Sequence, residues 1–239
     1  MDTTRANRSL EEGIRAVLSL RETVVLAQIS EKRIRKDIEK GYLSPLRASQ
    51  SRHCFRWPDV FFLAAVYRSD HLTGGGRQKV LRQLIANLLA PAYRREYDSW
   101  RHHDSWRHEY LHWRLRDKPS DLIVGTLDRM MIDGALSLDI AKVLGDVRPR
   151  VDLYASGLSH IEEKEGTLGG EAVFKNTRLS VRHIGMMSDS GEPTESILSD
   201  YPYLREDDVT FARLYHKAHP IVGRPRFGAE AIDVENVAG

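Results

Sequence analysis

The chain has 239 residues, of which 41% are hydrophobic and 29% are charged, and it carries a single cysteine. This content suits one large domain or two small ones, and one cysteine excludes both an internal disulfide framework and a zinc site built from cysteines. No apolar run reaches the length of a membrane span, and the N-terminus is polar without an apolar signal core. We therefore expect a soluble, cytoplasmic protein with no membrane partner.

The small net charge of +2 hides an asymmetry along the chain. Residues 1–92 hold 16 Lys/Arg against 9 Asp/Glu, whereas residues 93–239 hold 20 against 25. A basic front half suggests a polyanionic partner, and an acidic rear half suggests a different task. Charge alone does not decide this, because a chance distribution of surface charge gives the same balance.

The N-terminal part predicts three short helices. A capping box at Ser9–Glu12 predicts the first. Its apolar face holds Ile14, Val17 and Leu18. Residues 20–26 predict the second, and Ser30 is expected to cap a stronger third helix that runs to Lys40 and stops at Gly41.

Residues 42–56 predict an extended hairpin, because Pro45 and a polar tip argue against a helix. Residues 58–70 predict a helix rich in apolar side chains. Thr73–Gly76 is expected to break the chain and to lead into a further helix, and residues 77–89 carry the amphipathic spacing of that helix.

The centre of the chain, 93–118, is ambiguous between helix and loop. It repeats the sequence DSWRH at 98–102 and 104–108 and holds three of the four tryptophans. His108 and His112 have the spacing of a helical metal pair, but no accompanying carboxylate pattern follows. Interleaved aromatic and cationic residues are more typical of a stacking surface or a partner interface.

The remaining segments carry weaker patterns. Residues 110–115 and 122–124 suggest short strands, and residues 126–133 and 138–154 look helical in part. The last organised block, 158–219, is expected to begin with a hairpin-like stretch and to end in helices.

The segment 20–40 has the features of a helix-turn-helix. Ile29 precedes the predicted cap and Ile34 follows within the helix. This arrangement forms a hydrophobic staple, which fixes the angle at which the chain enters the helix. Ile34 and Ile38 lie on one face, four residues apart. The opposite face holds Lys32, Lys36 and Lys40. A helix that is apolar inside and cationic outside is suited to a major groove.

Seven cations of this region are predicted to contact DNA. They are Lys32, Arg33, Arg35, Lys36 and Lys40 on the helix, and Arg47 and Arg52 on the hairpin that would form a wing. An ordinary solvated helix is the alternative, since runs of charge usually have that origin. The coincidence of cap, staple, turn, cationic face and basic hairpin favours DNA binding.

Residues 19–70 resemble the MerR-like winged helix-turn-helix. The resemblance includes the stretch from Arg56 to Leu63, RWPDVFFL, and it departs at the turn, where Gln28 replaces the usual glycine. The resemblance implies a DNA-binding domain.

The rear block predicts a compact unit of about three helices. Gly169–Gly170 allows a tight turn, and Asn176 tolerates a left-handed backbone. Ser180 is expected to cap the first helix, Thr194 to start the second, and Glu206–Lys217 to form the third.

This block, over residues 151–226, resembles the small antitoxin-like family known as domain of unknown function 433. The matching positions are Gly169, Gly170, Val173, Thr177, Arg178, Val181, Gly191, Ile197, Leu198, Tyr201, Pro202, Leu204 and Val209. Three positions depart from the family pattern: Ala172, Asn176 and Ser180. Joined to a MerR-like front, the resemblance implies a VapB-type antitoxin that binds a PIN-like RNase toxin and represses its own operon.

Contacts with the toxin are expected in the rear half and its tail. The residues concerned are Arg178, Arg224, Arg226 and Phe227. A PIN active site is expected to be a carboxylate cluster, and each arginine of the tail can pair bidentately with a carboxylate. Phe227 would anchor the segment in an apolar pocket. An inert tail is the competing interpretation.

The expected fold class is mainly α with small β elements, comprising a winged helix-turn-helix domain and a small three-helix domain that is itself helix-turn-helix-like. The expected divisions are 9–92, a linking region 93–150, the rear domain 151–219 and a tail 220–239. We expect a homodimeric repressor that binds its own operator, with no cofactor, no metal and no enzymatic activity. Two alternatives stay open: a stand-alone regulator whose rear domain senses a ligand or partner, and an enzyme that uses the Trp/His-rich segment 98–113.

Overall fold

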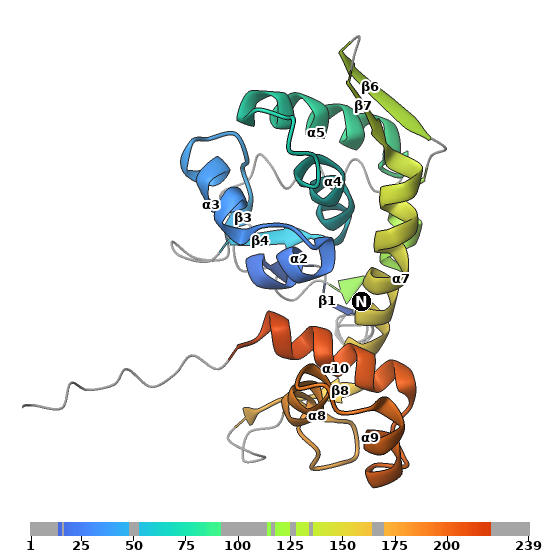
Figure 1. Cartoon of the computed structure of the whole chain (residues 1–239). Coiled ribbons are helices and arrows are strands. Elements are labelled where there is room, and N and C mark those ends of the chain that lie inside the picture. Colours follow the sequence, from blue (N-terminus) through green and yellow to red (C-terminus); the bar gives the residue numbers. More distant parts are fainter. Residues whose placement is uncertain are drawn as a thin grey trace, which may run out of the picture.

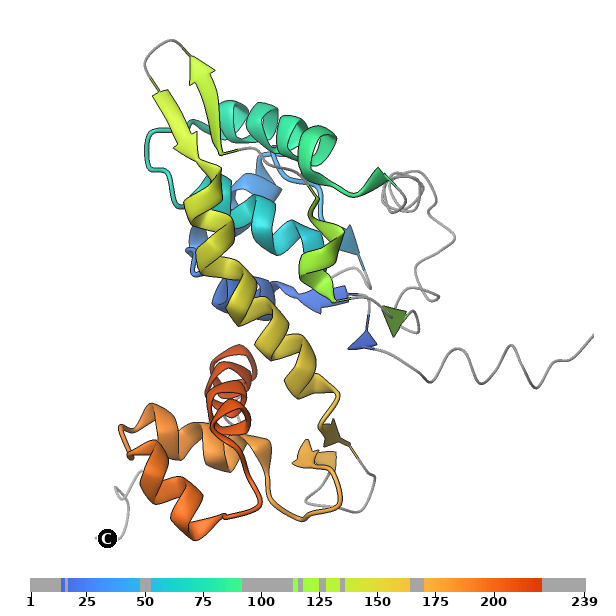
Figure 2. The ribbon, with the colours of Figure 1, turned by 90° about the vertical axis from the view of Figure 1, so that its right-hand side faces the viewer.

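The computed structural model describes residues 14–15, 17–47, 53–91, 114–115, 118–124, 128–133, 136–163 and 170–220. Helices dominate and the strands are short, which confirms the predicted fold class (Figure 1). A front unit holds the elements from β1 to α5, a rear unit holds those from β8 to α10, and the long helix α7 runs from one to the other (Figure 2). The Trp/His-rich segment 98–113 lies outside the described residues.

The front unit opens with strands. β1 (Ile14–Arg15) and β2 (Val17–Ser19) come first, and β2 pairs antiparallel with β4 (His53–Arg56). β3 (Leu46–Arg47) pairs with the other edge of β4, which gives a three-stranded sheet in the order β2-β4-β3. The predicted hairpin is therefore present.

The prediction of a helix carrying Ile14, Val17 and Leu18 is wrong. Val17 and Leu18 are both buried, in a strand where Leu18 lies opposite Phe55 of β4. The capping box that does form is at Ser19 and Glu22: the Ser19 hydroxyl accepts from the backbone N–H of Glu22, and the Glu22 carboxylate accepts from that of Ser19. It starts α2 (Leu20–Ala27), which agrees with the second predicted helix.

Three helices complete the front unit. α3 (Glu31–Glu39) follows α2 closely, α4 (Trp57–Tyr67) is buried along its whole length, and α5 spans Gly74–Leu88. The glycines after Thr73 do not break the chain: Thr73 caps α5 by accepting from the backbone N–H of Gly76, and the three glycines form the first turn.

The middle of the chain differs most from expectation. β5 (Arg114–Leu115) pairs with β1. Pro119–Leu122 forms a 3-10 helix, and of the short strand expected over 122–124 only an isolated bridge between Ile123 and Leu89 forms. β6 (Arg129–Asp133) and β7 (Leu136–Asp139) form an antiparallel hairpin where a helix was predicted over 126–133.

α7 (Ile140–Leu158) follows this hairpin without a break, because Asp139 ends β7 and also caps the helix by accepting from the backbone N–H of Lys142. The division expected between residues 150 and 151 falls inside this helix.

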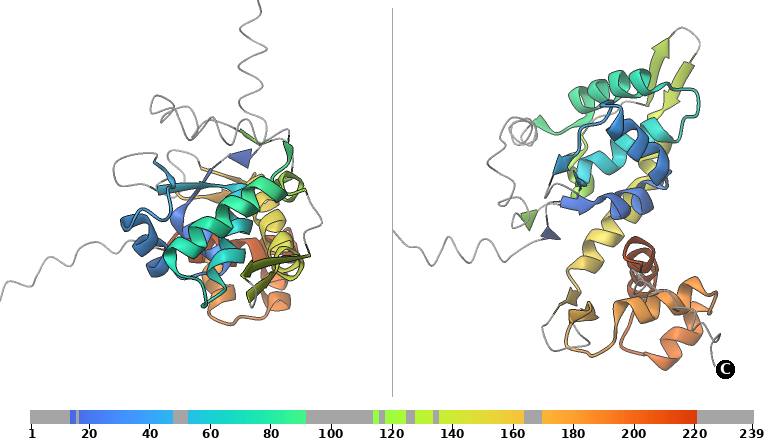
Figure 3. Two further views of the ribbon diagram at one scale, coloured as in Figure 1. Left: turned by 90° about the horizontal axis from the view of Figure 1, so that it is seen from above. Right: turned by 90° about the vertical axis from the view of Figure 1, so that its left-hand side faces the viewer.

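The rear unit follows the sequence-based expectations closely. β8 (Ile161–Glu162) pairs with β9 (Val173–Phe174), Asn176 adopts a left-handed backbone with φ of 61°, and Ser180 caps α8 (Val181–Asp189). α9 (Thr194–Asp200) and α10 (Glu206–Ala218) complete it. In Figure 3 the unit lies at one end of the molecule, with α10 turned toward the front unit.

The packing of α10 depends on close approach at two glycines. A Cβ at Gly185 of α8 would clash with the backbone of Ala212, and one at Gly157 of α7 would clash with the ring of Phe211. Both partners belong to α10, so a side chain at either glycine would push this helix away from its neighbours.

A buried carboxylate joins the two units. Glu22 of α2 is fully buried, forms an ion pair with Arg15, and accepts a hydrogen bond of 2.6 Å from the Tyr154 hydroxyl of α7. The Nε2 atom of His219, which follows α10, lies 3.6 Å from the same carboxylate. Around it, tilted aromatic contacts link Trp57 to Tyr154 and Tyr154 to Phe211.

Candidate nucleic-acid interface

The turn between α2 and α3 is sharp. Gln28 closes α2 with φ of 54° and ψ of 54°, the left-handed conformation that glycine favours, and the backbone N–H of Ile29 donates to the carbonyl of Val24 at 3.2 Å. Gln28, which stands in place of the glycine expected from the MerR-like resemblance, thus adopts a backbone that glycine favours.

The predicted cap of α3 differs in detail. The Ser30 backbone is extended, as a cap requires, but its side chain makes no capping hydrogen bond. Its carbonyl accepts from the N–H of Ile34. Ile34 is fully buried and Ile29 packs partly against the core, so the two apolar positions of the predicted staple do face inward.

α3 exposes a row of cations. Lys32, Lys36 and Lys40 are exposed and none of them has a partner in the described part of the chain, while Ile34 and Asp37 on the other side are buried. Residues four apart lie on one helix face, so the three ammonium groups share a single surface. Arg35 is also exposed but pairs with Glu31 at 2.7 Å, which reduces its availability for another anion.

Arg33 differs from the three lysines because it has partners within the chain. Its guanidinium donates to the Asp70 carboxylate at 2.8 Å and to the backbone carbonyls of Tyr67 and Ser69 at 3.2 and 3.0 Å. Three acceptors at the end of α4 thus hold it, and Arg33 positions α3 against α4 instead of offering a free cation.

The buried face of α3 is held by an ion pair between Asp37 and Arg77. Asp37 is almost fully buried, and Arg77 of α5 binds it bidentately at 2.7 and 2.8 Å. The Tyr67 hydroxyl of α4 donates to the same carboxylate at 2.8 Å. Burial alone would raise the pKa of Asp37, but the hydrogen bonds from Arg77 and Tyr67 outweigh it and hold that pKa below its ordinary value. We call these three side chains the α3 clamp.

The β3–β4 hairpin follows α3 in the chain and was predicted to form the wing. Arg47 sits on β3 directly opposite His53 of β4, and only its backbone is described. Arg52 lies outside the described residues. The structure therefore places the base of the predicted wing, and the contacts of its two arginines stay predictions.

Of the predicted toxin-binding residues, Arg178 is exposed in the turn before α8. Arg224, Arg226 and Phe227 lie outside the described residues. Within the described ranges no three His, Cys, Asp or Glu side chains gather in a way that fits a metal ion, and none of the described helices is long and apolar enough to cross a bilayer.

Comparison with known proteins bears on the rear unit. Residues 161–215, from β8 through most of α10, match the family described as "Protein of unknown function (DUF433)". The chain is also similar to "Uncharacterized protein y4eO" of Sinorhizobium fredii (strain NBRC 101917 / NGR234), with 26% identity over 91 residues that make up 38% of this chain and 41% of that protein. The match thus spans less than half the length of that relative. No solved structure matches the chain.

The family match confirms the resemblance predicted for the rear unit and is compatible with an antitoxin-like role. The MerR-like resemblance of the front unit stays a prediction. The structure shows α2 and α3 in succession and the three-stranded sheet β2-β4-β3 beside them.

The α3 clamp generates a prediction about stability. Asp37→Ala leaves the Arg77 guanidinium buried without its counter-ion, so we expect the free energy of unfolding to fall by about 3–5 kcal/mol. Denaturant titration of the full chain measures this. The exposed pair serves as the control, because Arg35→Ala should cost at most about 1 kcal/mol. Equal losses for the two variants would show that the clamp does not fix α3.

Proposed function

We propose that the front unit binds duplex DNA, with α3 in the major groove and the β3–β4 hairpin as a wing. The observation that carries this proposal is the row of exposed, unpaired lysines on α3 opposite a face held by the α3 clamp. A groove-binding helix needs free cations for phosphates and a rigid seat that fixes its orientation. Lys32, Lys36 and Lys40 supply the first, and Asp37 with Arg77 supplies the second.

For the rear unit we propose the role of an antitoxin that binds a PIN-like RNase directly, while the front unit represses the operon that encodes both proteins. The family match supports a role of this kind without identifying the toxin. Arg178 is exposed in the first turn of the rear unit and carries no partner in the described part of the chain. It is available to a carboxylate-rich surface, as are the arginines of the tail.

The full proposal is a cytoplasmic homodimer without enzymatic activity. Specific DNA binders commonly double a short recognition site through twofold symmetry, and a single winged helix reads only a short site. A stand-alone regulator that responds to a small ligand is the second candidate, and it is favoured by the cavity in the front unit described below.

The DNA proposal predicts a selective effect of charge on α3. Changing Lys32, Lys36 and Lys40 together to Glu should abolish operator binding in a gel-shift assay, because repulsion replaces attraction at the phosphates. The fold should persist, since all three side chains are exposed.

A matched control changes Lys118, Lys142 and Lys175, which are also exposed but lie on other elements, to Glu. This variant has the same net charge as the α3 variant. If both variants lose DNA binding equally, general charge and not the α3 surface is responsible, and the proposed interface is wrong.

The antitoxin proposal predicts a complex with a PIN-like RNase encoded beside this gene. Co-expression should give co-purification of the two chains and should rescue growth. Removing residues 221–239 while keeping His219 should abolish the rescue if the tail arginines fill the toxin's active site, whereas removing residues 1–8 should not. Failure of the intact chain to co-purify with the RNase would contradict the antitoxin role.

A further inference from the structure

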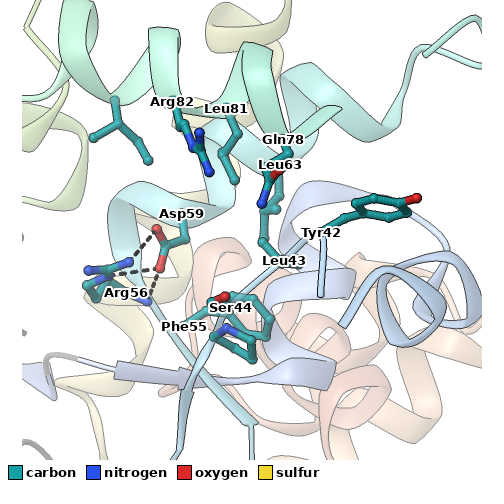
Figure 4. A pocket seen from close by; sticks show the side chains of 12 residues that line it. Tyr42, Leu43, Ser44, Phe55, Arg56, Asp59, Leu63, Gln78, Leu81 and Arg82 are labelled. Atoms are coloured by element: carbon teal, nitrogen blue, oxygen red, sulfur yellow. Dashed lines mark hydrogen bonds and ion pairs between the residues drawn. The ribbon is translucent and has the colours of Figure 1, made fainter. Parts of the chain in front are cut away.

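The front unit contains a cavity that the DNA-binding surface does not use. It has a volume of about 310 Å³ and lies between α4, α5, β4 and the segment 42–45 (Figure 4). This volume is at the lower end of the range for small-molecule sites in proteins. Its apolar walls come from Phe55, Leu63, Leu81 and Ile85, so a ligand with an apolar body would lose little by leaving water.

The charges that line the cavity do not cancel. Arg56 and Asp59 are both buried and bind each other, with Asp59 accepting at 2.8 Å from the Arg56 backbone N–H and at 3.0 Å from its side-chain Nε. Arg82 of α5 adds a second guanidinium, and the other lining residues are uncharged. Two cations face one carboxylate, which leaves a surplus positive charge.

Two polar side chains of α5 are available to a ligand. Neither Arg82 nor Gln78 has a hydrogen-bond or ion-pair partner in the described part of the chain. In Figure 4 both side chains extend from α5 toward the hollow, with Ser44 on the opposite wall. A guanidinium and an amide at one end of an apolar cavity match the carboxylate of an otherwise apolar molecule.

The cavity also touches the connection between the two predicted DNA-contacting elements. The segment 42–45 leads from the end of α3 directly into β3, and Phe55 and Arg56 belong to β4. A ligand seated here would contact β4 and the segment 42–45 that leads into β3, without touching the exposed lysines of α3.

We propose that this cavity binds a small organic anion, a carboxylate with an apolar body, and that the bound anion adjusts the position of the wing. Arg82 and Gln78 hold the carboxylate, and Leu63, Leu81 and Ile85 surround the apolar body. The binding itself stands apart from the proposed DNA function, whereas its effect on the wing rests on that function.

The test uses two carboxylates as probes, benzoate with a flat apolar body and octanoate with a flexible one. Titration of the full chain, followed by NMR of the methyl groups, should shift the signals of Leu63, Leu81 and Ile85 with at least one probe at millimolar concentration. Benzamide, the uncharged counterpart of benzoate, should bind at least about tenfold more weakly, a difference of about 1.4 kcal/mol.

Arg82→Met should weaken binding of the carboxylate by about tenfold or more, while Arg82→Lys should retain part of it because the charge remains. Lys79→Met is the matched control: Lys79 is an exposed cation on the same helix that does not line the cavity, so this change should leave the affinity unaltered. Arg82 is itself exposed, so its replacement should not unfold the chain.

The proposal is overturned if neither carboxylate shifts these methyl signals, or if Lys79→Met weakens binding as much as Arg82→Met. Gel shifts with DNA, in the presence and absence of the carboxylate, then test separately whether the bound anion changes DNA binding. A protein that binds the carboxylate but no DNA would keep the cavity assignment and refute the proposed function. A protein that binds the carboxylate and DNA without either affecting the other would refute only the proposed effect of the anion on the wing.

Discussion

The way the described front unit packs on α7 depends on the burial of one charge, the carboxylate of Glu22. A carboxylate removed from water must be compensated by ion pairs and hydrogen bonds, or the cost of desolvation exceeds what folding supplies. Its partners are Arg15 in the strand before α2 and the Tyr154 hydroxyl near the end of α7. The imidazole of His219 after α10 lies 3.6 Å away, and burial lowers its pKa to about 4, so it is neutral at pH 7 and adds no counter-charge. The segment before α2 and the end of α7 must therefore meet at α2, the first helix of the proposed helix-turn-helix.

This constraint explains why the two units pack directly against each other. α10 packs on α2 as well as on α7 and α8, and the aromatic series from Trp57 through Tyr154 to Phe211 fills the space around the buried charge. Arg150 of α7 adds a hydrogen bond of 2.7 Å to the carbonyl of Leu26 at the end of α2. A protein partner on the rear unit would thus contact a body that is packed directly against the helices proposed to bind DNA.

Much of the fold could be predicted from the sequence where local signals decide the structure. Ser180 as a cap, Asn176 in a left-handed turn and the starts of α9 and α10 all depend on neighbours a few residues away. The strand at 17–19 could not be predicted in this way. Its partner β4 lies more than thirty residues further on, and the apolar residues that suggested a helix are buried by that pairing.

In the candidate site, too, local features could be predicted from the sequence and long-range contacts could not. The exposed lysines of α3 followed from helical spacing alone, because their position depends only on the face that Ile34 turns inward. The roles of Arg33 and Asp37 did not, since their partners Asp70 and Arg77 come from the segment after α4 and from α5, and composition does not distinguish a paired arginine from a free one. Asp37 stands three residues after Ile34, on the face that the helical spacing turns inward, and this was the sequence signal that pointed to the clamp.

The central claim is that the front unit recognises duplex DNA, and the salt dependence of binding tests it most directly. Fluorescence anisotropy of the full chain with the DNA upstream of its own gene, and with a shuffled duplex of equal length, gives both affinity and specificity. We expect tighter binding to the upstream DNA, with an affinity that falls steeply as salt rises because phosphate contacts release counterions. Equal binding to both duplexes, or an affinity that does not change with salt, would contradict it.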